Sequence, residues 1–419
     1  MRVARERDPP DSRESCLSLA ARKSGLHDSA HWPIMATMKL QYIHSGRQFF
    51  FVTIALEGRP HALSRLVDER RRPALLPPGE IVKAALVAMH GVFPAAALSD
   101  FVIMPDHVHF LLIANYDLSP AFNPLWASHQ LMEAIEEGWR LGLKARGSAP
   151  APPHTAPSEG SGAESPSVPD MPAILAATVA RGREEAGILN RARREAEARG
   201  ADAAEIDALL AATRTSLTAA RPVPPLRFDR RCYIELSFSS RQLKTIRRYI
   251  RLNPARALWK QRHPDRFILH ANLRHPVLAP AHRWAAMGDL TLLASPFLLP
   301  VRLTLKKTVA EHEAEIAEIL ERARQGMIPV SGFLSPGETE LLRRLKAEPR
   351  CRFIKTVPYS LPPKYDPTAE DSRELAANRL LLLSAFPDAP QSLKTGFRAR
   401  CLEMNALATR LCEAAQTLE

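Results

Sequence analysis

The sequence contains little cysteine and no long apolar run. Only five cysteines occur in 419 residues, and no two of them form a Cys-x-x-Cys pair. This spacing excludes a zinc ribbon and a thioredoxin-like motif, and the small odd number predicts reduced thiols rather than a disulfide framework. No stretch approaches the roughly 18 uninterrupted apolar residues of a membrane span, so we expect no membrane partner. The charged N-terminus has no apolar segment behind it, which predicts a cytoplasmic protein without a secretory signal.

Acidic residues are outnumbered, and the excess positive charge is concentrated in one segment. The chain has 57 Lys and Arg against 45 Asp and Glu, a formal net charge of +12. Between Leu226 and His275, thirteen Lys or Arg face only three Asp or Glu. Nearly all of the net charge therefore lies in this segment, and a phosphate-backbone partner is the simplest explanation of it.

The length is sufficient for two or three domains, and the hydropathy pattern divides the chain accordingly. We predict a disordered tail at 1–37, a first domain at 38–278 and a second at 284–419. The predicted elements of the first domain are a strand at 47–56, a helix at 79–93, two short strands on either side of Pro105-Asp106, a helix at 128–145, a strand at 226–240 and a helix at 241–259.

Residues 146–222 interrupt this first domain. The stretch 147–172 consists almost wholly of Ala, Pro, Ser and Gly, a composition that cannot bury enough apolar surface to fold. The stretches 173–198 and 202–219 are rich in Ala, Glu and Arg and have a weakly amphipathic helical pattern. We therefore expect an insertion made of a disordered linker and a helical pair.

The last part of the chain alternates strand and helix patterns. Expected strands lie at 297–305, 327–332, 351–357 and 379–384, with helices at 308–325, 335–347 and 398–417. Alternation of this kind predicts a parallel sheet in an α/β domain.

His107 and His109 are separated by one residue in an expected strand. Side chains two residues apart point to the same face of a strand, so both imidazoles can bind one divalent cation if a third ligand arrives from elsewhere. The alternative is a half-buried strand without a metal. No suitably spaced acidic or cysteine ligand accompanies the histidines, which disfavours a zinc hydrolase.

The expected helix at 241–259 places a tyrosine beside a basic surface. Tyr249 and Asn253 are one turn apart and share a face, next to an apolar stripe. A basic arc flanks the stripe and consists of Lys244, Arg247, Arg248 and Arg251. The alternative is that Tyr249 is an ordinary rim aromatic and that Asn253 ends the helix before Pro254.

Together these segments resemble a known family. MPDHVHFLL resembles the HUH signature of the single-tyrosine transposases, and FDRRCYIEL followed by IRRYIRLNPARAL is similar to their downstream strand and tyrosine helix. The REP-associated tyrosine transposases are the branch that the chain resembles most. The resemblance covers about 38–118 and 224–278. Asp106 stands where relatives commonly carry Asn, and the long insertion is unlike the short segment that relatives have.

The resemblance implies a fold and a reaction. The first domain would be an α+β fold with a ferredoxin- or RRM-like antiparallel sheet, interrupted by the insertion. His107, His109 and Asn253 would bind Mg²⁺ or Mn²⁺, and Tyr249 would attack single-stranded DNA to form a 5′-phosphotyrosine. The implied DNA contacts are Lys244, Arg247, Arg248, Arg251 and Arg256. The substrate would include hairpin or palindromic repeat ends, in a nucleoid-associated protein, with a homodimer as an open alternative.

The second domain has a resemblance of its own, to the DprA-like branch of Rossmann-type folds. VSGFLSPGE at 330–338 is a strand–turn–helix junction, at which a helix starting near Ser335 would offer backbone N–H groups to a phosphate. The alternative is a domain that binds no ligand. Two further hypotheses for the whole protein follow: a non-catalytic, domesticated DNA-binding protein, and a nucleotide sensor acting through this domain.

Overall fold

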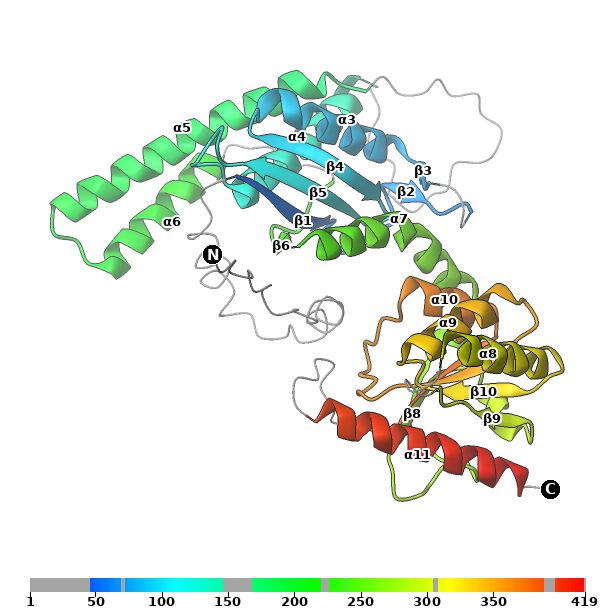
Figure 1. Cartoon of the computed structure of the whole chain (residues 1–419). Helices are drawn as coiled ribbons and strands as arrows, with labels where there is room; N and C mark the ends of the chain where they lie inside the picture. The colour runs from blue at the N-terminus through cyan, green and yellow to red at the C-terminus, as the bar shows by residue number, and fades with distance from the viewer. Residues whose placement is uncertain are drawn as a thin grey trace, which may run out of the picture. The chain divides into compact units, whose positions relative to one another are not determined.

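A computed structural model describes residues 46–68, 72–145, 168–219, 226–237, 239–303, 308–387 and 396–417. The chain divides into two compact units between Pro254 and Ala255. They are called here the N-terminal unit and the C-terminal unit (Figure 1). Both units contain helices and antiparallel strand pairs, so the protein is α+β. The expected tail at 1–37 lies outside the described residues.

The N-terminal unit is built on a four-stranded antiparallel sheet. Its order is β4 (Ala96–Ile103), β5 (His107–Asn115), β1 (Arg47–Ala55) and β6 (Tyr233–Ser237). A short ribbon of β2 (Ser64–Arg65) and β3 (Ala74–Leu75) follows β1. The central strands β1 and β5 are aromatic and β-branched, which suits residues that pack on both faces of a pleated sheet. The predicted strand at 226–240 is regular only over β6.

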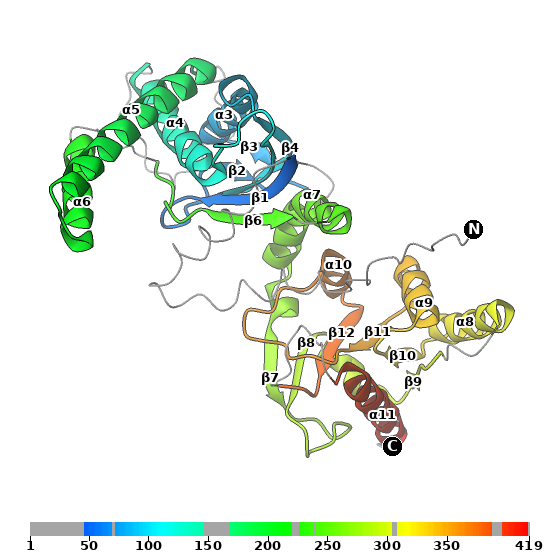
Figure 2. The same cartoon turned by 60° about the vertical axis from the view of Figure 1, so that its left-hand side comes forward.

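Helices cover the two faces of this sheet unequally. One face packs against α3 (Pro77–Val92), α4 (Pro124–Ala145) and the start of α5 (Met171–Ala198). α6 (Ala203–Ala219) pairs with α5. The core on this side includes Val52 and Phe110, both fully buried. The tyrosine helix α7 (Ser240–Arg262) lies along the other face (Figure 1, Figure 2).

The expected helical pair of the insertion is present as α5 and α6, but α5 is not an appendage. Met171, Leu175 and Val179 are four residues apart and at most 2% exposed. They pack into the same core as β1 and β5, because their spacing gives the start of the helix one apolar stripe. The beginning of α5 is therefore part of the fold. The linker expected before it lies outside the described residues up to Ser167.

The C-terminal unit contains a six-stranded mixed sheet. Its order is β7 (Leu269–Leu273), β8 (Trp284–Gly288), β12 (Leu380–Ser384), β11 (Phe353–Thr356), β10 (Ile328–Ser331) and β9 (Leu298–Pro300). The strands β9 to β12 are parallel, as the alternation predicts, whereas β8 and β7 join antiparallel at one edge. The strand β7 thus places residues before 278 in this unit, earlier than the predicted boundary.

Two helical layers enclose the parallel strands. α8 (Val309–Arg324), α9 (Pro336–Ala347) and α10 (Ala369–Ala376) belong with one core, and α11 (Phe397–Gln416) with the other. The run Leu380–Leu383 of β12 shows why helices are needed on both faces of the sheet. Leu381 and Leu383 face the α11 core and Leu380 and Leu382 the opposite one, so all four are buried. Short helix α10 was not predicted, since eight residues with three acidic groups give little apolar periodicity.

The described part of the chain holds no helix that is long and apolar enough to cross a membrane. Its four cysteines are free thiols, and burial raises the pKa of Cys232 to about 12. α7 runs through Pro254 and ends at Arg262, so the alternative in which Asn253 ends the helix is wrong.

Candidate active site

The face of the sheet that carries α7 brings the two histidines beside a threonine and a phenylalanine. On β5, His107 and His109 point to this face while Val108 and Phe110 enter the core on the other. The antiparallel register sets His109 opposite Thr53 of β1. His109 is only 2% exposed, whereas the side chain of His107 is 19% exposed at the edge of the site.

The two imidazoles converge through the same nitrogen. The Nε2 atoms of His107 and His109 lie 3.1 Å apart, with the ring planes at 77°. The other nitrogens are engaged elsewhere. Nδ1 of His107 lies 2.6 Å from Asp106 Oδ1, and Nδ1 of His109 lies 2.8 Å from Thr53 Oγ1. The pair therefore directs two Nε2 atoms, and no Nδ1 atom, at a shared point.

Asp106 is held in its ionised form. Burial alone raises the pKa of this carboxyl, but hydrogen bonding and charge from His107, together with Arg59, outweigh that and lower it. Arg59 lies 3.3 Å from the second carboxylate oxygen. The carboxylate thus bridges an arginine and the less buried histidine of the pair.

Tyr249 joins this group from α7. Its ring centroid lies 5.3 Å from that of His109 and 5.8 Å from that of Phe51, edge to face with both. Phe51 also stacks on His109 at 5.3 Å. The structure therefore brings the predicted nucleophile and the predicted ligand His109 together, although 140 positions separate them in the sequence. Helical spacing on α7 explains the approach, since the buried Ile246 and Ile250 fasten the neighbouring stripe to the sheet.

Asn253 follows Tyr249 by one turn on the same face of α7. Its Nδ2 atom is buried and has no hydrogen-bond partner within the described residues. An amide can be turned by 180° to exchange its oxygen and nitrogen, and a buried amide without a partner is unfavourable. Asn253, the predicted third ligand, thus has one side-chain polar atom without a hydrogen-bond partner in the described residues, and a bound group could contact it.

The donor set suits a divalent cation of moderate hardness. Two imidazole nitrogens directed at one point and an amide oxygen are ligands that Mn²⁺ accepts, with water filling the remaining positions. No cluster of three or more His, Cys, Asp or Glu with metal-binding geometry occurs in the described ranges. The two converging Nε2 atoms and the unpartnered amide of Asn253 are compatible with a site of two histidines and an amide.

Besides Thr53 and Phe51, two residues of β6 join the site without having been predicted. Glu235 of β6 accepts a hydrogen bond from the Tyr233 hydroxyl at 2.6 Å and one from Gln242 Nε2 of α7 at 3.3 Å. It thereby ties the beginning of the tyrosine helix to the sheet. Tyr233 stacks edge to face on Phe51 at 6.3 Å. The alternation along β6 shows in the sequence that Tyr233 and Glu235 share one face of the strand. That this face belongs to the site follows only from the pairing of β6 with β1.

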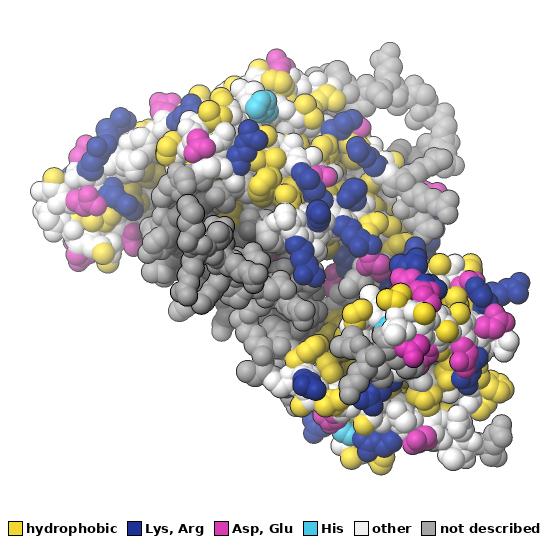
Figure 3. Space-filling view, in the orientation of Figure 1, with side chains coloured by type: hydrophobic (Ala, Val, Ile, Leu, Met, Phe, Trp, Pro, Cys, Tyr) yellow, Lys and Arg dark blue, Asp and Glu magenta, His cyan; other side chains and the backbone are white. Residues whose placement is uncertain are grey.

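The basic residues expected to contact DNA differ in their surroundings. Lys244, Arg248 and Arg251 are exposed on α7. Figure 3 shows Lys and Arg side chains gathered over this helix. Arg247 is partly exposed and pairs with Asp100 of β4 at 3.0 Å, while it donates to Ser99 at 2.8 Å. It fastens α7 to the sheet, which makes it a less available phosphate contact than the other three.

Arg256 does not lie on the surface, so the prediction that it contacts DNA is wrong. It is 7% exposed, forms an ion pair with Asp366 and donates to the Pro367 carbonyl at 2.9 Å. Lys260 binds the same carboxylate at 2.5 Å. Sequence spacing placed Arg256 near the basic arc, but α7 has already entered the C-terminal unit at this position.

The helix start near Ser335 does not offer free N–H groups. Ser335 Oγ accepts from the Glu338 N–H, and the Glu338 carboxylate accepts from the N–H groups of Leu334 and Ser335. Glu338 is 5% exposed and also accepts from the N–H of Leu303. The chain's own carboxylate therefore takes the place at which a phosphate was expected.

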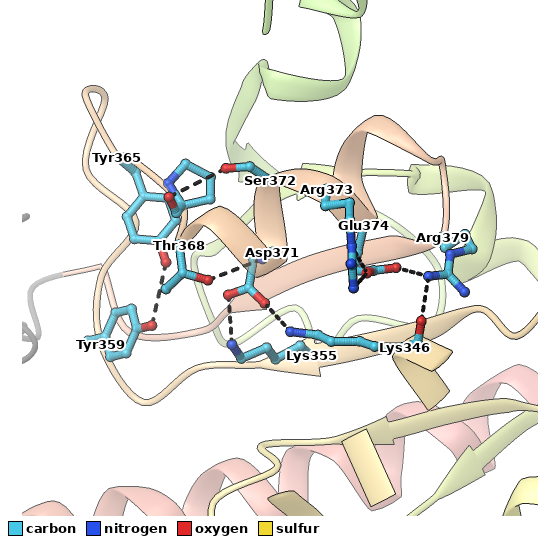
Figure 4. Close-up of polar contacts among 11 residues, drawn as sticks. Lys346, Lys355, Tyr359, Tyr365, Thr368, Asp371, Ser372, Arg373, Glu374 and Arg379 are labelled. Carbon is cyan, nitrogen blue, oxygen red and sulfur yellow. Dashed lines mark hydrogen bonds and ion pairs between the residues drawn. The ribbon is translucent and has the colours of Figure 1, made fainter. Parts of the chain in front are cut away.

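The strongest charged cluster of the C-terminal unit is satisfied internally. Asp371 of α10 is 1% exposed and accepts from Lys355 at 2.8 Å and from Lys346 at 3.2 Å (Figure 4). Nearby, Glu374 binds Arg373 and Arg379. Each of these charges has a partner, and the cluster holds α10 against β11 and α9.

Comparisons with known proteins add little to this geometry. No protein-family model matches the chain, and no curated protein sequence matches it. The chain is similar to a solved structure of DNA processing protein A from Helicobacter pylori, whose study concerns its single-stranded DNA binding mode. The identity is 22%, the match covers 36% of this chain and 78% of that one, and the TM-score is 0.27.

Proposed function

We propose that this protein is a DNA strand transferase that cleaves and rejoins single-stranded DNA through Tyr249. The observation that carries the proposal is the convergence of two Nε2 atoms, 3.1 Å apart, beside the ring of that tyrosine. In this proposal the N-terminal unit is a ferredoxin-like HUH domain. Apart from the β2–β3 ribbon and the helices α5 and α6, its elements from β1 to β6 follow the order strand–helix–strand–strand–helix–strand, which is in line with that fold. The C-terminal unit is a Rossmann-type accessory domain.

His107, His109 and Asn253 hold Mg²⁺ or Mn²⁺ in this proposal. A cation held there would supply Lewis-acid polarisation of the scissile phosphate. The histidines would bind it through Nε2, and the edge-on ring of Tyr249 keeps the phenol next to the buried imidazole of His109. Phe51 packs against both rings and limits their rotation.

Tyr249 is the nucleophile. Its phenolic oxygen forms a bond to phosphorus while the bond from phosphorus to the 3′ oxygen breaks, and the phenol proton ends on that oxygen. The products are a 5′-phosphotyrosine and a free 3′-OH. Attack by another 3′-OH reverses the step and rejoins the strand, so no nucleoside triphosphate is consumed.

The exposed basic residues of α7 bind the DNA backbone in this proposal. Lys244, Arg248 and Arg251 are exposed on the same stretch of α7 as Tyr249, on the side of the helix turned away from the sheet. Contacts from these side chains to phosphates would not depend on the base sequence. Hairpin or palindromic repeat ends are the expected substrates. A homodimer, in which the tyrosine of one subunit acts in the site of the other, stays a prediction.

The direct test is a covalent adduct. The purified full chain is incubated with Mn²⁺ and a pool of random single-stranded oligonucleotides, with and without hairpins, labelled at the 3′ end. The label shifts to the protein on a denaturing gel if a 5′-phosphotyrosine forms. We expect adducts with the wild type and none with Tyr249→Phe, which keeps the ring contacts.

Tyr233→Phe is the matched control, because Tyr233 also stacks on Phe51. This variant is expected to retain adduct formation. Adducts that persist in Tyr249→Phe would show that another residue is the nucleophile. Wild-type protein that binds the pool but forms no adduct would instead support a non-catalytic DNA-binding protein.

A further inference from the structure

Each histidine of the pair is held through its Nδ1 atom by a side chain outside the proposed ligand set. Asp106 holds His107 at 2.6 Å, and Thr53 holds His109 at 2.8 Å. The two contacts come from different places, a turn before β5 and the middle of β1. Both leave Nε2 as the nitrogen that faces the other ring.

The chemistry of these partners limits where each ring can carry a proton. An ionised carboxylate only accepts hydrogen bonds, so His107 must donate from Nδ1, and its Nε2 lone pair is left for a cation. The Thr53 hydroxyl can donate to Nδ1 of His109 while the two Nε2 atoms share a hydrogen bond, and it can accept from that Nδ1 when the shared proton is lost. Rings held like this would then present both Nε2 lone pairs to a divalent cation.

The Asp106 carboxylate is itself fixed on its other side. Arg59 lies 3.3 Å from Oδ2, at the end of a turn in which Gly58 and Arg59 both adopt positive φ, 70° and 57°. A positive φ is uncommon for an arginine. The turn is closed by hydrogen bonds from the Leu56 N–H to the Asp106 carbonyl and from the Arg59 N–H to the Leu56 carbonyl. This tight turn sets the guanidinium beside the carboxylate.

We propose that Asp106 and Thr53 are positioning residues that hold His107 and His109 in the tautomer that binds the catalytic cation. The inference rests on the proposed function, since it needs the histidines to be ligands. It predicts that Asp106 acts as a hydrogen-bond acceptor, so that an asparagine at this position would perform the same task through its amide oxygen.

The test measures Mn²⁺ binding by the metal-free full chain, using the loss of the free-ion electron paramagnetic resonance signal. Asp106→Ala and Thr53→Val are expected to weaken binding about 10- to 100-fold, the usual effect of losing such a partner of a ligating histidine. Asp106→Asn and Thr53→Ser keep an acceptor and are expected to stay within about 3-fold of the wild type. Asp117→Asn is the matched control, because this carboxylate accepts from the Gly46 N–H at the far end of β5.

A second measurement separates positioning from general damage. In metal-free protein with ¹⁵N-labelled histidine, at pH 8, the His107 ring is expected to carry its proton on Nδ1 in the wild type and in Asp106→Asn. In Asp106→Ala the same ring is expected to shift toward the Nε2–H form. An unchanged tautomer together with unchanged Mn²⁺ affinity in Asp106→Ala and Thr53→Val would overturn the inference.

The histidine variants distinguish this failure from failure of the metal site. His107→Ala and His109→Ala are expected to abolish measurable Mn²⁺ binding. Binding that is lost in these two but intact in Asp106→Ala and Thr53→Val would leave the metal site standing and refute only the positioning role. Binding that survives in the histidine variants would refute the metal site itself, and with it the inference.

Discussion

Arg248 and Arg256 lie on the same helix, eight residues apart, in opposite surroundings. Arg248 is exposed, whereas Arg256 is buried in an ion pair with Asp366. Burial raises the pKa of Asp366, but the charges of Arg256 and Lys260 outweigh it and lower the pKa. The identity of a residue thus predicts its charge, and only the packing around it decides which anion it meets.

Glutamine variants of the two arginines are expected to separate DNA binding from stability. Arg256→Gln is expected to lower the free energy of unfolding of the C-terminal unit by about 1–3 kcal/mol, because it leaves the Asp366 carboxylate with one cation instead of two. In Arg256→Gln, the salt dependence of oligonucleotide binding is expected to be the same as in the wild type. Arg248→Gln is expected to leave stability within about 0.5 kcal/mol and to flatten the salt dependence. Urea titration and fluorescence anisotropy measure the two effects.

Asp371 is expected to make the C-terminal unit sensitive to acid. Burial raises the pKa of Asp371, but Lys355 and Lys346 outweigh it, so the pKa lies below its ordinary value of 3.8. A carboxyl with a depressed pKa contributes stability above the unfolded pKa and loses it as the pH falls through the folded one. We expect wild-type stability, measured by urea titration, to fall below about pH 4.

Asp371→Asn is the matching variant. Its free energy of unfolding at pH 7 is expected to be lower by about 3–5 kcal/mol, since two lysines lose their buried partner. Below pH 4, its stability is expected to fall less steeply with pH than that of the wild type. An identical pH profile in the variant would show that Asp371 is not the group responsible.

At the scale of elements, α5 shows what helical spacing reveals. Its overall composition is polar, so the whole helix has weak amphipathicity, but the three residues that enter the main core, Met171, Leu175 and Val179, all lie in its first nine positions. Averaging over the helix conceals a stripe that packs on α3 and α4. The insertion thus contributes a structural helix to the N-terminal unit.

Leu175→Ala is expected to lower the free energy of unfolding of the N-terminal unit by about 2–5 kcal/mol, because Leu175 is fully buried in the main core. Val87→Ala on α3 is the control, with a side chain 65% exposed and an expected change within about 0.5 kcal/mol. Equal stability of the two variants in urea titration would show that α5 detaches without disturbing the core.

The strands of the site were the elements best predicted. The aromatic and β-branched run predicted β1 within one residue, and the apolar run after Pro105-Asp106 predicted β5, because both strands bury one face completely. The strand pairing was not predicted in detail. Thr53 and Glu235 join the site only through the register of β1 with β5 and β6, which depends on contacts distant in sequence.

At the scale of the whole molecule, the positive charge is divided between the two units by α7. The exposed cations Lys244, Arg248 and Arg251 belong to the N-terminal unit, whereas Arg256 and Lys260 are engaged with Asp366 in the C-terminal unit. Only part of the charge counted in the sequence is therefore available for DNA.

The salt dependence of binding tests this division in the intact chain. Replacing Lys244, Arg248 and Arg251 together by Gln is expected to reduce the slope of log affinity against log salt by about 2, at roughly 0.7 per phosphate contact on a single strand. The measurement is anisotropy of a labelled single-stranded oligonucleotide between about 50 and 200 mM salt. An unchanged slope of log affinity against log salt would show that these residues of α7 do not contact the DNA.

The sequence by itself determined the chemical inventory of the protein: a histidine pair on one strand face, a tyrosine and an asparagine one turn apart, and a basic segment around them. Those features depend on spacing within one strand or one helix, which local geometry fixes. The tertiary structure decided which of them meet. It set Tyr249 against His109, supplied Asp106, Thr53 and Glu235 as their partners, and removed Arg256 from the surface. These contacts depend on packing between segments that are distant in the sequence, so no local sequence pattern predicts them.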